Sequence, residues 1–455
     1  MSTVRPLPTF ASLCLLTLAA CGGRAAPPNI ILITLDTLRA DHLSCYGYAR
    51  ETSPRLDAFA AQATRYTNSR ATAPWTVPTH ASLFTGLHPF EHGAHSFDIT
   101  ALSDNVYALD GNAPTLAEVL GSGGYRTGAI VANQVYLAPE LGLDRGFGDY
   151  SLARERAPEL SRRALTWIDA AGEPFFLFLN YLDTHRPYNV AGSDGGHEAE
   201  PAQHPSVLLD RLHDQVMVKG HPPEPALRAQ VIGQYDRSIE NLDAALGQFF
   251  DALGERGLLE NTWIVITSDH GEYFGEHGLV EHSKDVYEEA LAVPLIVRAP
   301  GQARGTLVDT PVSSVDLPRL ILDGALPEHA EHWRAIFPHA PGSHGVLAQN
   351  YYSRPIDLLH PTIGPRLRRV RTVLYRGSRK FIHSSDGRHE LYDLGRDPAE
   401  STNLIGREPD FDARLRAEAE ALLAGPRAHA PGATEPRELG AERLDAMRAL
   451  GYLEF

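Results

Sequence analysis

Residues 29–36 read NIILITLD, an apolar run that ends directly on the carboxylate of Asp36. A short run without polar alternation predicts a strand that is buried on both faces of a parallel sheet. In open sheets of this class, ligands bind beyond the carboxyl ends of the strands, so Asp36 is well placed to hold a cation. The alternative is an aspartate that only caps a turn or a helix.

Four further apolar runs predict strands of the same sheet, at residues 129–131, 175–179, 263–267 and 294–297. Helical patterns lie between them. The clearest covers residues 226–253, where apolar side chains recur at alternating steps of three and four. Alternating strands and helices predict an α/β fold, here a three-layer α/β/α sandwich around a mostly parallel sheet.

The last part of the chain predicts a small C-terminal α+β subdomain. Short strands are expected at residues 370–375, 380–383 and 390–394, and an amphipathic helix at residues 411–423. Upstream, residues 190–225 are rich in Gly, His, Pro and acidic residues, with little periodicity. This composition predicts an inserted surface loop that could cover a site.

The N-terminus predicts export. Residues 10–20 are apolar, too few to span a bilayer and typical of a signal peptide. They run into Leu18-Ala19-Ala20-Cys21, which resembles a bacterial lipoprotein box with Cys21 as the lipidated residue; a plain secretory signal is the alternative. We expect an exported bacterial lipoprotein on the periplasmic face of a membrane or the cell surface, with residues 22–28 as a flexible tether.

The formal charge of the 455 residues is −16, from 41 Lys and Arg against 57 Asp and Glu. A nucleic-acid binder normally presents a basic face, so this balance argues against a nucleic-acid partner. It leaves room for one basic pocket that takes an anionic substrate.

A second chemical cluster lies at residues 75–86, which read WTVPTHASLFTG. Pro78 suits the first turn of a helix and places Thr76 beside the helix N-terminus, where backbone N–H groups favour an anion. Thr76 could therefore attack a tetrahedral ester such as a sulfate or a phosphate. It could equally serve only as the cap of the helix.

A third cluster, TSDHGE at residues 267–272, follows a predicted strand directly. Asp269 and His270 can both reach one metal ion if the backbone turns there, and Gly271 permits such a turn. Side chains of His and Lys near a metal bind substrate oxygens or protonate a leaving group. A dispersed set of this kind comprises Asp183, His185, His282 and Lys284.

Taken in order, these motifs resemble the sulfatase family. They are NIILITLD at 29–36, PTHASLFTG at 78–86, TSDHGE at 267–272, YEE at 287–289 before VPLIV at 293–297, SVDL at 314–317, and ELYDL at 390–394 with Asp397-Pro398 and Asn403-Leu404. The resemblance covers residues 28–405 and implies an alkaline-phosphatase-like core with a divalent cation at the carboxyl edge of its sheet.

The resemblance also implies roles for single residues. Its metal-binding positions fall on Asp36, Asp269 and His270, and Thr76 occupies the nucleophile position at the metal. A further set is expected to act in catalysis or at a second metal ion. The catalytic candidates are Thr76, His80, His185 and Lys284, where His80 replaces the family's usual arginine; the candidates for a second metal site are Asp183 and His282.

Thr76 departs from the family pattern, in which a Cys or Ser is converted to formylglycine. Threonine carries a β-methyl group and would give a ketone, so this maturation is not expected here. Thr37 likewise stands where many sulfatases have a second aspartate, and residues 132–134 read ANQ where a Gly-Lys-Trp-His stretch is expected. Threonine nucleophiles occur among phosphodiesterases, phosphonate hydrolases and transferases that resemble sulfatases in fold.

We therefore predict a metal-dependent hydrolase of sulfate or phosphate esters, with Ca, Mg, Mn or Zn as the cofactor. Its anionic substrate would be a sulfated or phosphorylated glycan, lipid or small molecule. A phosphodiesterase, phosphonate-type hydrolase or phospho-group transferase is one alternative, and an inactive surface protein that binds an anionic ligand is another. The expected organisation is a lipoprotein signal peptide at 1–21, a tether at 22–28, a sulfatase-like catalytic domain at 29–325, and a C-terminal subdomain with a helical tail at 326–455.

Overall fold

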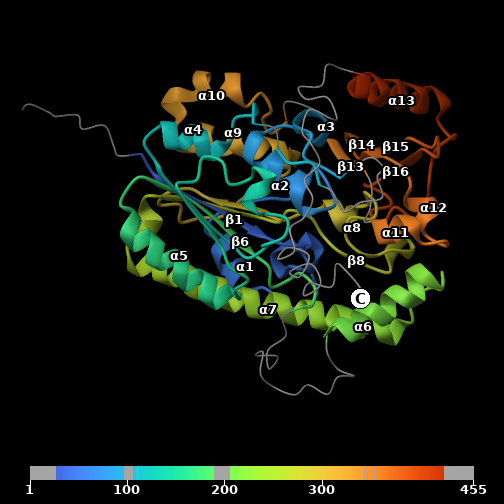
Figure 1. The fold of residues 1–455 in the computed structure, drawn as a ribbon, viewed down its shortest axis with the longest axis horizontal. Helices are drawn as coiled ribbons and strands as arrows, with labels where there is room; N and C mark the ends of the chain where they lie inside the picture. Colours follow the sequence, from blue (N-terminus) through green and yellow to red (C-terminus); the bar gives the residue numbers. More distant parts are fainter. Residues whose placement is uncertain are drawn as a thin grey trace, which may run out of the picture.

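The computed structural model describes residues 27–96, 106–109, 111–188, 205–342, 345, 347–351 and 355–424. Its largest feature is an eight-stranded sheet (Figure 1). The strands are β1 (Asn29–Leu35), β2 (Thr64–Tyr66), β4 (Arg126–Val131), β5 (Asp149–Leu152), β6 (Phe175–Tyr181), β7 (Thr262–Thr267), β10 (Leu295–Arg298) and β11 (Thr306–Val308). Their order across the sheet is β11-β2-β10-β7-β1-β6-β4-β5.

The sheet is mostly parallel, as predicted. Strand β1 pairs in parallel with β6 and β7, β4 with β5 and β6, and β11 with β2. The exception is β10, which runs antiparallel to both β2 and β7. The predicted run at residues 294–297 is therefore a strand, but its apolar sequence carries no sign of its reversed direction.

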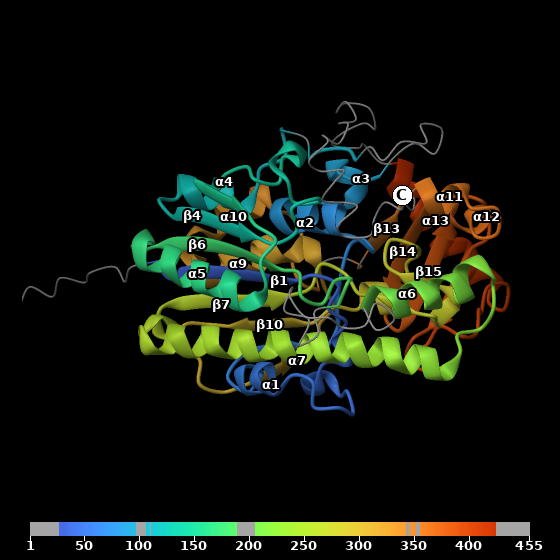
Figure 2. The same cartoon turned by 60° about the horizontal axis from the view of Figure 1, so that its bottom comes forward.

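Helices cover both faces of this sheet and complete the predicted three layers (Figure 2). One layer contains α1 (Pro54–Ala60), α5 (Ala157–Ala171) and α7 (Pro225–Glu255); the other contains α2 (Thr76–Thr85), α4 (Leu116–Ser122), α9 (Leu317–Ala325) and α10 (Ala330–Ile336). Side chains of β1 alternate between the two layers. Ile31 and Ile33 pack in the core of the first layer, and Ile30 and Leu32 in that of the second.

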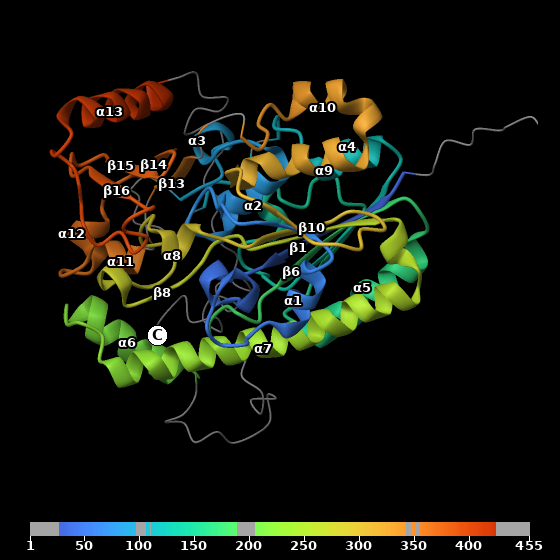
Figure 3. The same cartoon turned by 180° about the vertical axis from the view of Figure 1, so that it is seen from behind.

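Helix α7 confirms the predicted helix at residues 226–253 and crosses the whole first layer (Figure 3). Pro225 occupies its first turn, where a proline costs no hydrogen bond. The apolar stripe at Leu242, Leu246 and Phe249 is buried in the core, whereas Gln248 on the opposite face is exposed. Burial of this stripe therefore fixes the helix against the sheet.

A four-stranded antiparallel sheet forms the C-terminal part of the described chain. It contains β13 (Leu347–Asn350), β14 (Arg371–Arg376), β15 (Arg379–Ser384) and β16 (Glu390–Asp393), flanked by α11 (Pro355–Leu359), α12 (Gly364–Leu367) and α13 (Pro409–Ala424). The three predicted strands and the tail helix are confirmed, and β13 is an addition. Leu415 and Ala419 of α13 pack on Leu374 and Phe381 of the sheet.

Short elements connect the two sheets. They are β3 (Ser69–Arg70), β8 (Tyr273–Phe274), β9 (Val280–Glu281), β12 (Val312–Ser313), α3 (Pro89–His92) and α8 (Glu288–Leu291). The N–H of Gln349 in β13 donates to the Thr72 carbonyl, 2.8 Å away, which joins the C-terminal sheet to the segment just before α2.

The prediction of a loop at residues 190–225 is wrong for the second half of that range. Residues 205–218 form helix α6 (Pro205–His213) and a π-helical turn, η5 (Asp214–Val218). Leu209, Leu212 and Met217 are buried in the core of the first layer, so tertiary burial overrides the irregular composition. The first half of that loop, the signal peptide with Cys21 and most of the tether lie outside the described residues; among described residues, no helix is long and apolar enough to cross a membrane.

We expect Phe249→Ala to lower the free energy of unfolding by about 3–5 kcal/mol, because it removes a ring that is 1% exposed and leaves a cavity against the sheet. Gln248→Ala, one position along the same helix on the exposed face, should change it by less than about 0.5 kcal/mol. Denaturant unfolding of both variants checks this. Equal effects would mean that α7 does not pack as described.

Candidate functional site

Four neighbouring strands deliver polar residues to one edge of the sheet. The strands β7, β1, β6 and β4 are adjacent and parallel, so their carboxyl ends meet at the same edge. The residues that follow them are Asp269 and His270 after β7, Asp36 after β1, Asp183, Thr184 and His185 after β6, and Asn133 after β4. The predicted position of the site, beyond the carboxyl ends of the strands, is the one observed.

Asp36, Asp269 and His270 form the centre of this edge. All three are 0% exposed, and one ligand atom from each lies within 4.8 Å of the others. Asp36 Oδ1 and Asp269 Oδ2 are buried without a hydrogen-bond partner, and neither carboxylate pairs with a lysine or arginine among the described residues. Burial, reinforced by repulsion from Asp269, raises the pKa of Asp36 to about 8. Burial also raises the pKa of Asp269 to about 7.

The ring of His270 is oriented as a metal ligand requires. Its Nδ1 lies 3.0 Å from the Gly271 carbonyl, which can only accept, so Nδ1 carries the proton. Burial lowers the pKa of His270 and favours the neutral ring. Nε2 then carries an unshared electron pair and lies 3.4 Å from Asp269 Oδ2. A histidine held in this way by a carbonyl is the usual arrangement at metal centres.

Gly271 serves the site by close packing. A Cβ at this position would lie 2.0 Å from the Glu289 carbonyl oxygen and 3.0 Å from Arg39 Cγ. The sequence favoured Gly271 as a turn residue, but its φ is not left-handed. The Gly271 N–H donates to the Ala290 carbonyl at 2.9 Å, and this contact holds the Asp269–His270 loop against the start of α8.

Thr37, which stands where many sulfatases have a second aspartate, uses its side chain to bond to the backbone. Its hydroxyl donates to the Thr184 carbonyl at 2.7 Å, away from the carboxylates. Its backbone is left-handed, with φ 61°, an uncommon state for a β-branched residue. This turn lets the Thr37 N–H donate to Asp269 Oδ1 at 3.2 Å, while the Tyr235 hydroxyl holds the Thr37 carbonyl at 2.7 Å.

Thr76 is the first residue of α2 rather than its cap, which is Trp75. Its hydroxyl is therefore not used in capping. Thr76 Oγ1 lies 3.5 Å from His270 Nε2, and the nearby hydroxyl helps to lower the pKa of Asp269 against the effect of burial. The predicted nucleophile is thus placed directly at the carboxylate–histidine centre.

His80 lies behind Thr76 and faces the interior. Its Nδ1 is 2.9 Å from the Thr76 carbonyl, so it donates there, and its Nε2 is 3.1 Å from the Thr34 hydroxyl. The Asn180 amide in turn donates to Thr34 Oγ1 at 3.2 Å. Burial lowers the pKa of His80 to about 3, so the ring is neutral. Both nitrogens are used inside the protein, which corrects the predicted catalytic contact: His80 positions Thr76.

Asn133 is a site residue that sequence reasoning missed. Its side-chain amide donates to Asp36 Oδ2 at 3.0 Å, and its own N–H donates to Asn180 Oδ1 at 3.0 Å. Asn180 therefore links Asp36 to the Thr34–His80–Thr76 chain. The only sequence signal was the departure from the family pattern at residues 132–134, which contains the asparagine that replaces the expected residues.

His185 and His282 are brought together beside the centre. The ring of His282 lies 4.6 Å from that of His270 and 5.1 Å from that of His185, measured between centroids. His185 Nδ1 is 2.7 Å from the Arg186 carbonyl, and burial lowers its pKa to about 3. His282 Nδ1 is 3.1 Å from Oε1 of the fully buried Glu272, a second residue that was not predicted.

Lys284 is placed differently from the prediction. Its ammonium forms an ion pair with Asp357 of α11 and lies 3.9 Å from Glu281 Oε2, and its side chain is 0% exposed. Glu281 also pairs with Arg186. The lysine thus belongs to a buried network that ties α11 to the loop after β9, and Asp357 orients it.

Asp183 is not brought to a second metal site. Its Oδ1 accepts the Ala157 N–H at 3.1 Å and so anchors the start of α5. Among the described residues, neither Asp183 nor His282 joins a group of three side chains that could hold a metal ion. The physical reason is direction, because Asp183 points toward a helix N-terminus where N–H groups attract it.

The donor set fits a divalent cation. Two buried carboxylates with unpartnered oxygens, a neutral imidazole Nε2 and a hydroxyl converge within a few ångströms. Without a cation, burial and mutual repulsion would leave this pair partly protonated at neutral pH, as the raised pKa values of Asp36 and Asp269 express. Carboxylate oxygens with one imidazole suit Ca, Mg, Mn or Zn.

Comparison with known proteins agrees with this geometry. The sulfatase family model matches residues 28–325. Human arylsulfatase A is 28% identical over 441 residues, covering 86% of this chain and 86% of the relative. The uncharacterized sulfatase YidJ of Escherichia coli is 26% identical over 343 residues, covering 64% and 66%.

Solved structures share the fold. The phosphonate monoester hydrolase of Agrobacterium radiobacter superposes with a TM-score of 0.64 at 20% identity, covering 87% of this chain and 95% of its own. BT4656, solved with its substrate D-glucosamine-2-N,6-O-disulfate, gives a TM-score of 0.65 at 19% identity, covering 88% and 98%. The chain therefore belongs to the sulfatase family and is a sulfatase-like ester hydrolase with an alkaline-phosphatase-like fold.

Proposed function

We propose that the chain is a metal-dependent hydrolase of sulfate or phosphate esters, with Thr76 as its nucleophile. One observation carries the proposal: Thr76 Oγ1 lies 3.5 Å from His270 Nε2, beside two buried carboxylates that each have one oxygen without a hydrogen-bond partner. Asp36, Asp269, His270 and Thr76 would hold the ion. A divalent ion at such a site lowers the pKa of a hydroxyl and offsets charge on the transferring group.

Thr76 is placed for attack by its position at the start of α2. Oγ1 would form a bond to sulfur or phosphorus as the bond to the ester oxygen breaks, and the proton that Oγ1 gives up would end on the leaving oxygen. The α2 N-terminus favours the oxyanion that Thr76 would attack. Behind it, the Nδ1–H of His80 holds the Thr76 carbonyl and keeps the residue at the site.

The histidine pair suits the second half of the reaction. Nδ1 of His185 donates to the Arg186 carbonyl, so Nε2 is the acceptor nitrogen, and an anionic ester bound beside it would favour the protonated ring. A water that loses its proton to this pair could attack the threonine ester and restore the free hydroxyl. Water activation by a side chain is needed because Thr76 lacks the second hydroxyl of a hydrated formylglycine.

Phosphodiesters and phosphonate esters are the second candidate class, and Thr76 itself supports it. A residue with a β-methyl group does not yield formylglycine, which is the group on which sulfatase chemistry is built.

The relative solved with a disulfated glucosamine supports a sulfated saccharide as the anionic substrate. Turnover of sulfate esters and of phosphate esters therefore has to be compared directly.

We expect Thr76→Ala to lower turnover of aryl sulfate, phosphate and phosphodiester substrates by on the order of a thousandfold or more, because the attacking oxygen is gone. Acid-quenched wild-type enzyme should carry a phosphoryl or sulfuryl group on the peptide that contains Thr76, visible by mass spectrometry. Thr166→Ala, an exposed threonine of α5, is the matched control and should keep wild-type rates. Full activity in Thr76→Ala would disprove the assignment.

We expect the purified chain to hold a stoichiometric divalent ion that EDTA removes, and Asp36→Asn to hold much less. The substitution removes a negative charge while keeping an acceptor for Asn133. Asp183→Asn is the control and should keep the ion, since its side-chain oxygen can still accept the Ala157 N–H. Elemental analysis of the three proteins measures this. A wild-type chain that binds no ion after incubation with Ca, Mg, Mn or Zn would favour an inactive binding protein.

We also propose that the chain is exported and anchored through a lipid on Cys21. The support is the sequence Leu18-Ala19-Ala20-Cys21 alone. In a bacterial host, labelled palmitate should enter the wild-type protein and not Cys21→Ser, and the variant should leave the membrane fraction. Labelling that survives the substitution would contradict this.

A further inference from the structure

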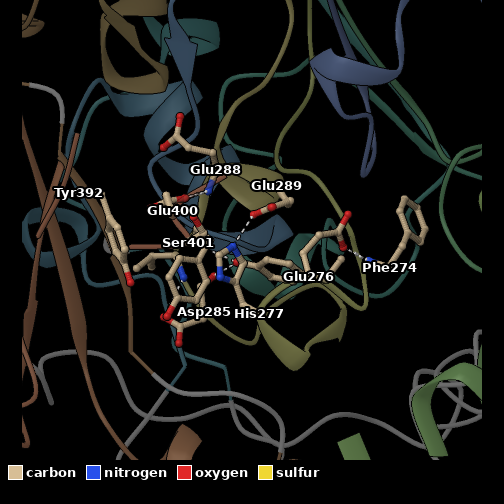
Figure 4. Close-up of polar contacts among 12 residues, drawn as sticks. Phe274, Glu276, His277, Asp285, Glu288, Glu289, Tyr392, Glu400 and Ser401 are labelled. Carbon is tan, nitrogen blue, oxygen red and sulfur yellow. Dashed lines mark hydrogen bonds and ion pairs between the residues drawn. The ribbon is translucent and has the colours of Figure 1, made fainter. Parts of the chain in front are cut away.

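A cavity of about 530 Å³ lies between the loop after β8 and the C-terminal sheet. Its wall includes His277, Tyr287, Arg366, His389, Tyr392 and Asn403, with the carboxylates of Glu390 and Glu400 beside them. The loop that carries Asp269 and His270 lies next to α8, to which two backbone hydrogen bonds join it. The Gly271 N–H donates to the Ala290 carbonyl and the Glu272 N–H to the Glu289 carbonyl. The side chain of Glu289 lies against the ring of His277, with Oε2 3.3 Å from Nε2 (Figure 4).

The two carboxylates in the wall are already satisfied. Glu390 accepts the hydroxyls of Tyr287 and Tyr392 on Oε2, each at 2.9 Å, and Arg371 on Oε1 at 2.7 Å. Glu400 pairs through Oε1 with the Lys380 ammonium at 2.8 Å and accepts the Glu288 N–H on Oε2. Neither carboxylate therefore dominates the charge that a ligand meets.

A metal ion is a poor occupant of the same wall. His277, Glu289 and Glu400 do approach one another, with a ligand atom of each within 4.8 Å. However, the Lys380 ammonium already occupies Glu400 Oε1, and a like charge so close would repel a divalent ion. The group is better described as an ion-pair network, in which His277 Nε2 lies 3.3 Å from Glu289 Oε2.

The groups that remain in the wall are donors. Arg366 gives one N–H to the His277 carbonyl at 2.7 Å, and its charge helps to lower the pKa of the nearby Asp285. Asn403 uses Oδ1 to accept the N–H groups of Leu391 and Ile405, so its amide NH₂ is not used in these bonds. His389 Nδ1 accepts the Ser384 N–H, which puts the proton of the neutral ring on Nε2.

Three aromatic rings border these donors: Tyr287 and Tyr392 are each 5% exposed, and the His277 side chain is 13% exposed. The ring of His277 stacks on that of Tyr287, with centroids 3.8 Å apart and planes 10° from parallel. Tyr392 lines the same cavity and lies 6.3 Å from Tyr287 between ring centroids. The few exposed ring atoms give an apolar border to N–H donors, and such donors bind the acidic substituent of a sugar.

We propose that this cavity binds a sugar that carries a sulfate or carboxylate group. Arg366, Asn403 and His389 hold the oxyanion, and the exposed atoms of His277, Tyr287 and Tyr392 border the sugar. The choice of an anionic sugar rests on the proposed function, whereas the oxyanion site rests on the donors of the wall. The site is distinct from the Thr76 centre and adds a second point of contact for an anionic saccharide.

Calorimetric titration of Thr76→Ala protein with D-glucosamine-2-N,6-O-disulfate tests the proposal, and the non-hydrolysing background makes the readout independent of turnover. We expect Arg366→Ala to weaken one binding event at least tenfold. Asn403→Asp keeps both backbone acceptors and places a carboxylate in the cavity, so it should abolish that event without disturbing the fold. Arg396→Ala, whose side chain is 89% exposed on the same subdomain and outside the wall, should bind as the parent does.

The probes separate the parts of the proposal. Glucuronate should compete for the site, whereas uncharged N-acetylglucosamine should not. Inorganic sulfate that binds as tightly as the disulfated sugar would overturn the role of the aromatic wall. Unchanged titrations in both Arg366→Ala and Asn403→Asp would overturn the site itself. Failure of Thr76→Ala to lose turnover would overturn the proposed function and leave these titrations as they are.

Discussion

The rest of this structure depends on two buried carboxylates. Asp36 and Asp269 lie together at the end of adjacent strands, both 0% exposed and both with an oxygen that lacks a partner. A pair of this kind is unfavourable unless a cation or a proton lies between the charges. The neutral His270 and the hydroxyl of Thr76 complete a set of donors that suits a cation.

Backbone strain collects where these groups must be held. Thr37, Glu281 and Ser283 are non-glycine residues at φ 61°, 66° and 60°, next to Asp36 and on either side of His282. Surrounding contacts fix each of them, as the Tyr235 hydroxyl does for the Thr37 carbonyl. Strain of this kind persists where the fold over-determines a position, which is common at functional sites.

Much of the site was predictable because its residues follow strands. An apolar run ending on Asp36, and another ending before Asp269 and His270, place those side chains at one edge of a parallel sheet. Asn133 and the true position of His80 were not predictable. Both depend on hydrogen bonds to residues far away in sequence, such as the one from Asn133 to Asp36. Lys284 is redirected in the same way by Asp357 of the C-terminal part.

The sequence by itself determined five of the eight strands of the main sheet, the long helix α7, and which polar residues stand at strand ends, because these depend on patterns among near neighbours in the chain. Only the tertiary structure decided the reversed direction of β10, the helical state of residues 205–218, and which side chains face the metal-type centre. Those features depend on burial and on charge pairing between distant segments. A local sequence pattern does not predict which distant residue a buried histidine, lysine or carboxylate will contact.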